Sequence, residues 1–407
     1  GIIKGHEPAC PFYGIGAKIF DQYIRVFLCR IKNGGIHRHM ENQKGKQLKY
    51  VQLMADLKKK ILSGEILPGE KIPSENILAA QYQVSRQTVR KAIAIMENEG
   101  YVYAEHGRGT FCTELVRHKH ESGNIAVITT YLSDYIFPQV IRGIDKVLTR
   151  EGYSIILKNT RNSRTQEIHC LQELLQKDID GVIIEPSKSQ IYCKHTELFA
   201  KFWEFQIPCV FIQGCYEQMK QQPQVLMDDC KGGYLITRHL IGLGHRNIIG
   251  VFKADDTQGQ NRHKGYAKAL GEAGIAYDPE KVIWFHTEDR TVHPYEKICQ
   301  MIRETAVMDG IVCYNDQIAW EVIRALQDSG LRVPEDISVC GYDDSSMALS
   351  GNLRLTTIAH PQERLGVMAA ELLLRLIHGE ENGEKDRIMI EPELVEGNSC
   401  KKRKNNL

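Results

Sequence analysis

Hydrophobic residues in the first part of the chain recur every three to four positions, which is the spacing of one helix face. They stand at positions 48, 51, 53, 54, 57 and 61, and again at 89, 92, 93 and 96. A Pro68-Gly69 turn signal separates the two sets. Ser74 and Ser85 are placed to cap the free amide groups of two helix starts. The pattern predicts three short helices, over 48–60, 73–82 and 84–100.

The segment after these helices has the period of a strand. Residues 101–112 alternate β-forming and polar positions around Gly107 and Gly109. Alternation interrupted by glycines is typical of a two-stranded hairpin. Three helices followed by a hairpin predict a winged helix-turn-helix at the N-terminal end of the chain.

Basic residues in this region are not interspersed with acids. Between positions 76 and 96 the chain has no Asp or Glu, and it carries Arg86, Arg90 and Lys91 there. The hairpin tip adds His106 and Arg108. A charged face that only meets solvent would carry both signs, so a face of one sign predicts contact with the phosphates of DNA.

The rest of the chain, from Asn124, alternates apolar strand-like runs with helical segments. The alternation includes a long helix expected to end at Phe205, and it continues through two similar halves up to about residue 396. This rhythm predicts an α/β fold with two lobes, each built on a parallel sheet. Two such lobes joined by crossing strands describe a hinged, periplasmic-binding-protein-like sensor domain.

Polar and aromatic residues follow the predicted strands of both lobes, where open α/β sheets bind ligands. They are Tyr131, Ser133, Asp134, Tyr135, Glu185, Lys188, Gln213, Arg262, Asn315, Asp316, Asp343 and Asp344. Carboxylates, amides and an arginine beside aromatic rings suit a neutral polyhydroxylated ligand. Asp316 and Asp344 are equally suited to capping the following helices, and Tyr131 to packing in a wall.

Composition restricts the possible chemistry further. The chain has 407 residues, with 52 Lys and Arg against 51 Asp and Glu, so only its local charge can attract DNA. Its 12 cysteines include no C-x-x-C pair, and the histidines at 37, 39, 118 and 120 lack partners at zinc spacing. We therefore expect no metal and no cofactor. With no apolar run of about 20 residues and no signal peptide, we expect a cytoplasmic protein without membrane contact.

Residues 61–112 closely resemble the GntR-type winged helix through the stretches GEILPGEKIPSE, VSRQTVR and HGRGT. The resemblance implies that the start of the recognition helix and the wing tip touch DNA. The matching positions are Asn76, Ser85, Arg86, Gln87, Thr88, Arg90, His106, Gly107 and Arg108. Arg86 and Gln87 have donor geometry suited to base edges, while Thr88 and Arg90 suit phosphates. Gly107 lets the wing backbone approach the minor groove.

The second region resembles LacI/GalR-type sugar-sensing domains through NRHKGYAKAL, CYNDQIAWEVIRAL, VPEDISVCGYDDS and the stretch 353–373. That resemblance implies that Arg262, Asn315 and Asp343 hold a sugar. A GntR-type head fused to such a sensor resembles the AraR-type arabinose repressors. YLSDYIFPQVIRGID and GVIIEPSKSQ are similar to their sugar-site segments, which adds Asp134, Tyr135, Glu185 and Lys188. The resemblance implies a repressor that L-arabinose releases from operator DNA.

The domain limits follow from composition. Residues 1–39 precede the first methionine, Met40, and lack periodicity, so we expect a leader outside the folded domains. The winged helix-turn-helix is expected over 40–113, a linker over 114–123, the sensor and dimerisation domain over 124–396, and a basic tail over 397–407. The segment 365–377 is more apolar than one sheet face needs, which predicts a homodimer formed through the sensor.

Two other functions compete with a repressor. A nucleotide-dependent sugar enzyme would need a G-x-x-x-x-G-K-[ST] or G-x-G-x-x-G loop after a strand, and neither occurs. A stand-alone sugar-binding protein that serves a transporter would not need the basic winged helix. The sequence therefore favours a DNA-binding regulator over an enzyme or a carrier.

Overall fold

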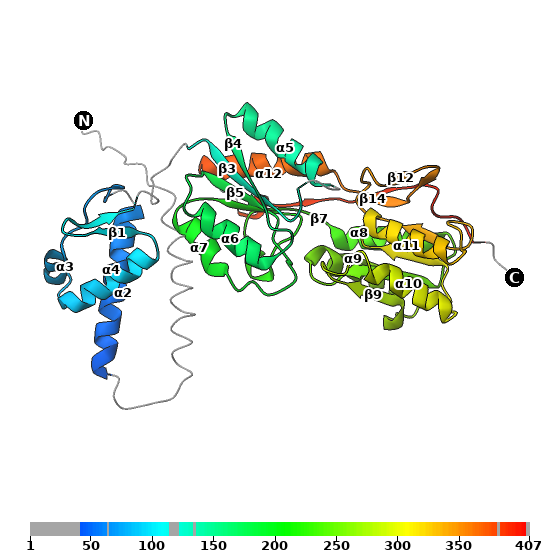
Figure 1. Ribbon diagram of the computed structural model, residues 1–407, viewed down its shortest axis with the longest axis horizontal. Coiled ribbons are helices and arrows are strands. Elements are labelled where there is room, and N and C mark those ends of the chain that lie inside the picture. Colours follow the sequence, from blue (N-terminus) through cyan, green and yellow to red (C-terminus); the bar gives the residue numbers. More distant parts are fainter. Residues whose placement is uncertain (1–40, 63–64, 114–121, 133–135, 381–382, 404–407) are drawn as a thin grey trace, which may run out of the picture. The chain divides into compact units, whose positions relative to one another are not determined.

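The computed structural model describes residues 41–62, 65–113, 122–132, 136–380 and 383–403. The chain divides into two compact units at residue 113, coloured from blue to cyan and from cyan to red in Figure 1. The expected leader, 1–39, and most of the expected linker, 114–123, lie outside the described residues. Within the described ranges, no helix has the length and apolar character needed to cross a membrane.

The N-terminal unit is a winged helix, as predicted. Its elements are α2 (Glu41–Leu62), α3 (Glu75–Gln81), α4 (Arg86–Asn98), β1 (Val102–Glu105) and β2 (Gly109–Cys112). Ser74 accepts a hydrogen bond from Ile77 N and Ser85 accepts one from Thr88 N, so both predicted caps are confirmed. The predicted inward face of α4 is buried against α2, and β1 pairs antiparallel with β2.

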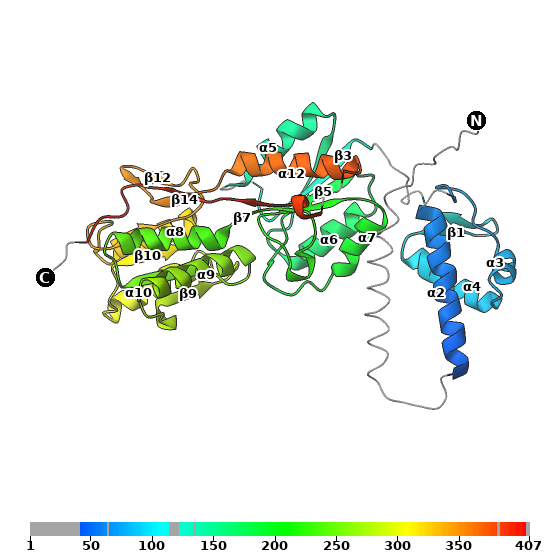
Figure 2. The ribbon, with the colours of Figure 1, turned by 180° about the vertical axis from the view of Figure 1, so that it is seen from behind.

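The first lobe of the second unit is built on a six-stranded parallel sheet in the order β15-β7-β6-β5-β3-β4. Its strands are β3 (Asn124–Thr129), β4 (Ser154–Asn159), β5 (Gly181–Ile184), β6 (Cys209–Ile212), β7 (Gln224–Met227) and β15 (Arg387–Ile390). The helices α6 (Arg164–Leu174) and α7 (Thr196–Glu204) cover the face opposite to α5 (Phe137–Arg150) and α12 (Gln362–Ile377), as Figures 1 and 2 show.

Helix α12 is integral to this lobe although it follows the other lobe in sequence. It packs on β5, β6 and β7 and along α5. The two helices approach closely at Gly143 and Gly366, where an added Cβ would lie 2.1 Å from a backbone oxygen of the other helix. Leu365, Ala369 and Leu373 are fully buried in the same core. The apolar excess of 365–377, read from the sequence as a dimer surface, is therefore used inside the lobe.

The second lobe has a four-stranded parallel sheet in the order β11-β10-β8-β9. Its strands are β8 (Ile248–Lys253), β9 (Val282–Phe285), β10 (Gly310–Cys313) and β11 (Ser338–Cys340). One face packs against α8 (Asp229–Gly242) and α9 (Thr257–Glu272), and the other against α10 (His293–Arg303) and α11 (Asp316–Asp328). Both predicted parallel sheets are thus confirmed.

The chain crosses between the lobes at three places, which Figure 2 shows side by side. The first crossing joins β7 to α8, and the second joins β14 (Thr357–Ala359) to α12. The third joins β15 to β16 (Glu393–Val395), which pairs antiparallel with β14. The short remaining pair is β12 (Leu349–Ser350) with β13 (Leu353–Arg354).

Two expectations about element limits are wrong. The long helix expected to end at Phe205 is only α7, because residues 186–195 form a loop with turns. The sensor also continues past residue 396, where a basic tail was expected. Ser399 is fully buried, donates to Val339 O at 2.6 Å and accepts from Thr356 N at 2.8 Å.

Candidate functional site

The residues expected to contact DNA lie on one exposed face of the winged helix. Arg86 and Gln87 are exposed in the first turn of α4, and Asn76 is exposed in the first turn of α3. Asn76 and Arg86 border a shallow depression together with Lys71 and Gly109 from the base of the wing. The recognition helix, α3 and the wing therefore present one continuous surface, with the tip residues His106, Gly107 and Arg108 exposed beside it.

Four of these residues already have partners inside the unit, and one of them, Arg108, pairs with Glu105 in the wing. The Ser85 hydroxyl lies 2.8 Å from the Thr88 hydroxyl and also caps α4. Arg90 Nε donates to both carboxylate oxygens of Glu75, at 3.0 and 2.9 Å. Glu75 lies one residue before the stretch without acids that the sequence singled out. The cationic face therefore includes the carboxylates of Glu75 and Glu105, and Glu75 orients the guanidinium of Arg90 and weakens its net charge.

The wing also contains a residue that the sequence reading missed. Lys71 forms an isolated β-bridge with Phe111, on the edge of β2 opposite to β1. Its side chain passes over Gly109, where an added Cβ would lie 2.4 Å from Lys71 Cε. Lys71 thus places one more exposed cation beside Asn76 and Arg86, and Gly109 leaves room for it.

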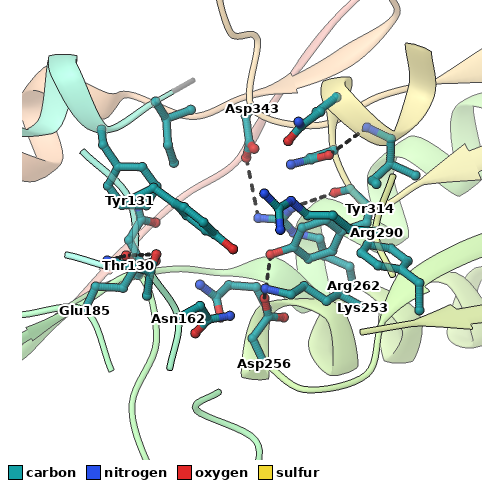
Figure 3. A pocket seen from close by; sticks show the side chains of 18 of the residues that line it. Thr130, Tyr131, Asn162, Glu185, Lys253, Asp256, Arg262, Arg290, Tyr314 and Asp343 are labelled. Carbon is teal, nitrogen blue, oxygen red and sulfur yellow. Dashed lines mark hydrogen bonds and ion pairs between the residues drawn. The ribbon is translucent and has the colours of Figure 1, made fainter. Parts of the chain in front are cut away.

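A cavity between the two lobes collects the ends of eight strands (Figure 3). The first lobe contributes residues that follow β3, β4, β5 and β6, and the second contributes residues at the ends of β8, β9, β10 and β11. The lining residues used below are Thr130, Tyr131, Phe137, Asn162, Glu185, Gln213, Lys253, Asp256, Arg262, Phe285, Arg290, Tyr314, Asn315 and Asp343. A cavity therefore lies where a ligand site was expected, beyond the carboxyl ends of the parallel strands.

Arg262 is the centre of the second lobe's side of the cavity. Its Nε donates to Asp229 at 2.8 Å, one NH2 group donates to Tyr314 O at 2.6 Å, and the other lies 3.5 Å from Asp343. The guanidinium is stacked between the rings of Tyr314 and Tyr342. Burial raises the pKa of Asp229 to about 6 against the opposing effect of Arg262. Arg262 therefore fixes the orientation of Asp343 toward the cavity.

The backbone of Asp343 is held in an uncommon conformation. Its φ of 98° lies in the left-handed region, which a residue with a side chain rarely adopts. Asp343 N donates to Ile358 O at 2.8 Å, so strand β14, which leads into a crossing, fixes this conformation. Unusual backbone geometry held by its surroundings is typical of ligand-binding positions.

The first lobe presents a buried carboxylate to the cavity. Glu185 Oε2 accepts from Thr130 N at 2.9 Å and from the Thr130 hydroxyl. Burial raises the pKa of Glu185 to about 7, and the two hydrogen bonds oppose this rise. Across the cavity, Lys253 Nζ lies 3.1 Å from Asp256, which also accepts from the Tyr314 hydroxyl at 2.7 Å. The site thus combines fixed acceptors and donors from both lobes, as Figure 3 shows.

The cations that line the cavity do not outnumber the carboxyl groups around them. Lys253, Arg262 and Arg290 face the carboxyl groups of Glu185, Asp256 and Asp343, and Asp229 pairs with Arg262 from behind the lining, which offsets the partial protonation of Glu185 near neutral pH. A dianionic ligand such as a sugar phosphate needs a surplus of cations, which this lining does not provide. The aromatic side chains of Tyr131, Phe137 and Phe285 add apolar wall. The lining fits a neutral ligand with both polar edges and apolar faces.

Two buried polar atoms in this lining have no hydrogen-bond partner among the described residues. They are the hydroxyl oxygen of Tyr131 and the side-chain nitrogen of Gln213. The carbonyl oxygen of the same Gln213 side chain is occupied, since it lies 2.8 Å from His360 Nε2. Native proteins rarely leave buried polar groups unpaired, so both atoms indicate where a bound ligand supplies hydrogen bonds.

Six of the ten predicted ligand residues line the cavity, namely Tyr131, Glu185, Gln213, Arg262, Asn315 and Asp343. Ser133, Asp134 and Tyr135 lie outside the described residues. Asn315 also caps α11 by accepting from Ile318 N at 3.0 Å. Of the two aspartates weighed as caps, Asp316 accepts from Ser345 and Thr357, and Asp344 pairs with Arg354. Arg262 lies in the second turn of α9, whose start is capped by Asp256.

Lys188 is the predicted ligand residue that the structure places elsewhere. Its ammonium group contacts Glu288 and lies 3.5 Å from Asp255, both in the second lobe. Nearby, Asn162 donates to the Thr287 hydroxyl at 2.7 Å, and the Ser189 and Thr257 hydroxyls are 3.1 Å apart. We name this set of contacts the interlobe latch. Lys188 is therefore held between the lobes instead of lining the cavity.

The cavity also contains residues that the sequence reading missed. Lys253 and Phe285 are the last residues of β8 and β9, and Tyr314 directly precedes Asn315, so their positions at strand ends could have identified them. Thr130 and Asn162 follow β3 and β4 in the same way. Arg290 lies in a loop before α10, and its sequence offers no such signal.

Two family models match the chain, and they divide it as the fold does. Residues 49–112 match the bacterial regulatory proteins of the gntR family. Residues 237–400 match the periplasmic binding protein-like domain. The second match extends over Ser399, in agreement with the burial of that residue in the sensor.

Full-length relatives share both units. The chain is 42% identical over 361 residues to an arabinose metabolism transcriptional repressor of Halalkalibacterium halodurans, covering 86% of this chain and 96% of the relative. It is 37% identical to the Geobacillus stearothermophilus protein of the same name, covering 87% and 98%. A LacI family transcriptional regulator from Enterococcus faecium with bound ribose superimposes with a TM-score of 0.60 at 27% identity. That match covers 69% of this chain and all of the other.

The two repressors are regulators of transcription and not enzymes, and their alignments cover 86% and 87% of this chain, so they extend over both of its units. The chain therefore belongs to the family of arabinose metabolism transcriptional repressors, in which a GntR-type winged helix is fused to a LacI-like sensor domain.

Proposed function

We propose that the chain represses transcription as a homodimer on operator DNA and is released when a neutral monosaccharide, L-arabinose, fills the interlobe cavity. The single observation that carries the sugar assignment is the lining itself. It combines balanced charges, aromatic walls and two buried polar atoms that await partners. Hydroxyl groups donate and accept, so adjacent sugar hydroxyls can satisfy Gln213, Tyr131 and the carboxylates together.

L-arabinose is the proposed sugar for two reasons. The two full-length relatives are arabinose metabolism repressors, and a related sensor holds ribose, another pentose. The balance between three cations and three carboxyl groups in the lining argues for a free sugar over a sugar phosphate. Under this proposal Asp343 and Arg262 grip the ligand from the second lobe, and Glu185 and Gln213 grip it from the first. Asp134 and Tyr135 remain proposed contacts.

DNA binding is proposed to follow the division of roles expected from the sequence. Arg86 and Gln87 reach base edges from the first turn of α4, because both are exposed and neither pairs with another side chain of the described residues. Thr88, Arg90 and Lys71 reach phosphates, and the wing tip approaches the minor groove at Gly107, whose φ is 76°. Because its target is operator DNA, we place the protein in the bacterial cytoplasm.

Homodimerisation is proposed to use the second lobe. Trp320 on α11 donates to Met347 O at 2.6 Å. The side chains of Met347 and of Leu349, two residues further on, are 38% and 56% exposed. Such an apolar cluster on an exposed surface is typical of a protein interface. Two half-sites are needed because a single winged helix buries too little surface for specific recognition.

Sugar binding is proposed to weaken operator binding through lobe closure. A ligand that contacts both lobes stabilises the closed sensor by the difference between its affinities for the two states. Closure that turns the paired sensors would disturb the spacing of the winged helices on their half-sites. A coupling of about 1 to 3 kcal/mol is expected, and operator DNA must weaken sugar binding by the same factor.

The test uses the purified full chain with L-arabinose, D-ribose, D-galactose and arabinose 5-phosphate. L-arabinose is expected to raise the melting temperature of the sensor and to weaken operator binding at the same concentrations. Arabinose 5-phosphate should do neither. A larger shift with the phosphate would contradict the argument from charge balance, and tighter operator binding with L-arabinose would contradict the proposed sign.

A further inference from the structure

Two cysteines that are far apart in the sequence lie close together at the edge of the second lobe. Cys340 is on β11 and is fully buried, whereas Cys400 follows β16 and is partly exposed. Their sulfur atoms are 3.4 Å apart. The C-terminal segment brings them together, because it lies along the edge strand: Lys401 N donates to Ser338 Oγ at 3.2 Å, and Cys400 Sγ lies 3.5 Å from Val339 O.

The surroundings favour ionisation of one of the two sulfurs. The imidazole of His239, on α8, is in hydrogen-bonding contact with the Cys400 sulfur. Hydrogen bonding from Cys340, and to a smaller extent from His239, lowers the pKa of Cys400 below the usual range of a thiol, against the effect of burial. Burial raises the pKa of Cys340 above the usual range of a thiol. The pair thus combines the Cys400 sulfur, whose ionisation its neighbours favour, with the buried Cys340 thiol, which can resolve a sulfenic acid formed there.

The other cysteines of the described residues lack the features that favour ionisation of Cys400. Burial raises the pKa of Cys112, Cys193, Cys209 and Cys215 to about 11 or above. Cys299 is partly exposed, but its sulfur lies only near Ala325 O, at 4.0 Å. The Cys340 and Cys400 pair therefore combines a second sulfur at 3.4 Å, a neighbouring imidazole and a position on a partly exposed residue.

We propose that Cys340 and Cys400 form a reversible redox site, in which a hydroperoxide oxidises the pair to a disulfide that fastens the C-terminal segment to β11. In the first step the Cys400 thiolate attacks the peroxide oxygen, so an S–O bond forms, the O–O bond breaks and hydroxide leaves as water after protonation. In the second step Cys340, giving up its proton, attacks the Cys400 sulfenic sulfur, the S–S bond forms and a second water leaves. Two thiols and one hydrogen peroxide thus give one disulfide and two waters.

The disulfide would act on the part of the sensor that carries a ligand-facing residue. Strand β11 ends at Cys340, three residues before Asp343. The C-terminal segment is otherwise held by Ser399 and by Arg403, which contacts Asp309. Closing a loop between positions 340 and 400 reduces the freedom of the unfolded chain, so the oxidised protein should melt at a higher temperature than the reduced protein.

The experiment treats the reduced full chain with one equivalent of hydrogen peroxide and counts free thiols after denaturation. We expect a loss of two thiols per chain, a linked pair of peptides that contain positions 340 and 400, a higher melting temperature, and full recovery after dithiothreitol. Cys400→Ser should abolish all of these, and Cys299→Ser, the matched control at another partly exposed cysteine, should abolish none.

A third variant separates a reactive pair from two thiols that are only close in space. His239→Gln should slow thiol loss several-fold at neutral pH while the linked peptides stay the same, because the imidazole stabilises the thiolate. Sulfinic acid at Cys400 without a linked peptide, a disulfide from Cys400 to another cysteine such as Cys313, or unchanged thiol loss in Cys400→Ser would each overturn the proposal.

Discussion

Arginine side chains perform different tasks in the two units, and their exposure explains the difference. On the winged helix, the side chains of Arg90 and Arg108 are 69% and 72% exposed, and each pairs with one carboxylate of its own unit. In the sensor, the side chain of Arg262 is 6% exposed between Asp229 and Asp343. An exposed ion pair contributes little and can exchange its carboxylate for a phosphate. A buried arginine cannot leave its partners without a large cost, so it acts as a fixed support.

The two regions therefore bind their ligands through different interactions. The DNA face keeps its cations hydrated and available, which gives an affinity that depends on salt. The cavity keeps its ions paired in advance, so that a neutral ligand needs to supply only hydrogen bonds and an apolar face. Variants in one region should respond to salt and sequence, and variants in the other to stability, pH and sugar.

The largest effect is expected from Arg262→Ala. Removing the guanidinium leaves the buried carboxyl groups of Asp229 and Asp343 without their cation, which should lower the free energy of unfolding by about 3 to 5 kcal/mol. Denaturant unfolding of the sensor unit measures this loss. The matched control is Arg332→Ala, at the exposed Arg332–Asp336 pair, where little change is expected. Equal losses in both variants would contradict the distinction between buried and exposed arginines.

A pH effect of similar size is expected at His360. Burial lowers the pKa of His360 to about 4, next to Gln213, with Arg262 and Asp343 also acting on it. The unfolded chain takes up this proton near pH 6.5, whereas the folded chain resists protonation down to about pH 4. The histidine's contribution to stability is therefore present above pH 6.5 and is lost as the pH falls through this window, by up to about 3 kcal/mol.

His360→Gln tests this expectation. The free energy of unfolding is measured at pH 7 and at pH 5 for both proteins, so that effects of Asp229, Asp316 and Glu185 cancel in the comparison. Wild type should lose about 2 kcal/mol more than the variant over these two units. The exposed His378→Gln variant is the control and should follow wild type. A variant that loses as much as wild type would show that His360 does not titrate in this range.

In the winged helix, substitutions of Arg86 and Arg90 should change DNA binding in different ways. Arg86→Ala should cost about 1 to 3 kcal/mol and relax the preference at one operator position, if Arg86 reads a base edge. Arg90→Ala should weaken all sequences alike and lower the salt slope by roughly one, if Arg90 holds a phosphate. Operator and scrambled duplexes titrated at several salt concentrations distinguish the two.

Glu75→Gln sharpens the test of Arg90. The carboxylate of Glu75 competes with phosphate for the guanidinium. Neutralising it should therefore strengthen binding to both duplexes slightly and increase the salt slope. Identical, sequence-independent losses in Arg86→Ala and Arg90→Ala would remove the assigned roles.

The two regions also differ in how far the sequence predicted them. In the winged helix the predictive signals are local: Ser74 and Ser85 cap the helices that they precede, and Gly107 lies in the turn of the hairpin tip. The pairing of Arg90 with Glu75 was missed because it joins two helices, and the stretch without acids begins one residue after Glu75.

In the sensor, the parallel sheets and the strand ends followed from the periodicity, and with them the positions of Glu185, Gln213 and Asp343. Which side chains meet across the cavity depends on how the lobes face each other, and no local pattern encodes this. Lys188 follows a strand as Glu185 does, but its long side chain reaches Glu288 and Asp255 of the other lobe. The apolar face of α12 was misread for the same reason, since its partner α5 lies far away in the sequence.

The smallest effect is expected at the interlobe latch. Its ion pair is intermediate between the exposed pairs of the winged helix and the buried pairs of Arg262. Lys188 is 18% exposed, Asp255 is 1% exposed and Glu288 is 67% exposed. If the latch supports the closed sensor without touching the sugar, Lys188→Met should weaken L-arabinose binding by about two- to fivefold, since such a pair contributes about 0.2 to 1 kcal/mol. Operator affinity without sugar should stay unchanged, because the variant leaves the winged helix intact.

Lys231→Met, at the exposed pair with Glu391, is the matched control and should bind sugar as wild type does. The measurement is calorimetric titration at low and high salt, because screening should weaken the latch in wild type and have less effect in the variant. Complete loss of sugar binding in Lys188→Met would instead place its ammonium group on the ligand, as the sequence resemblance implies.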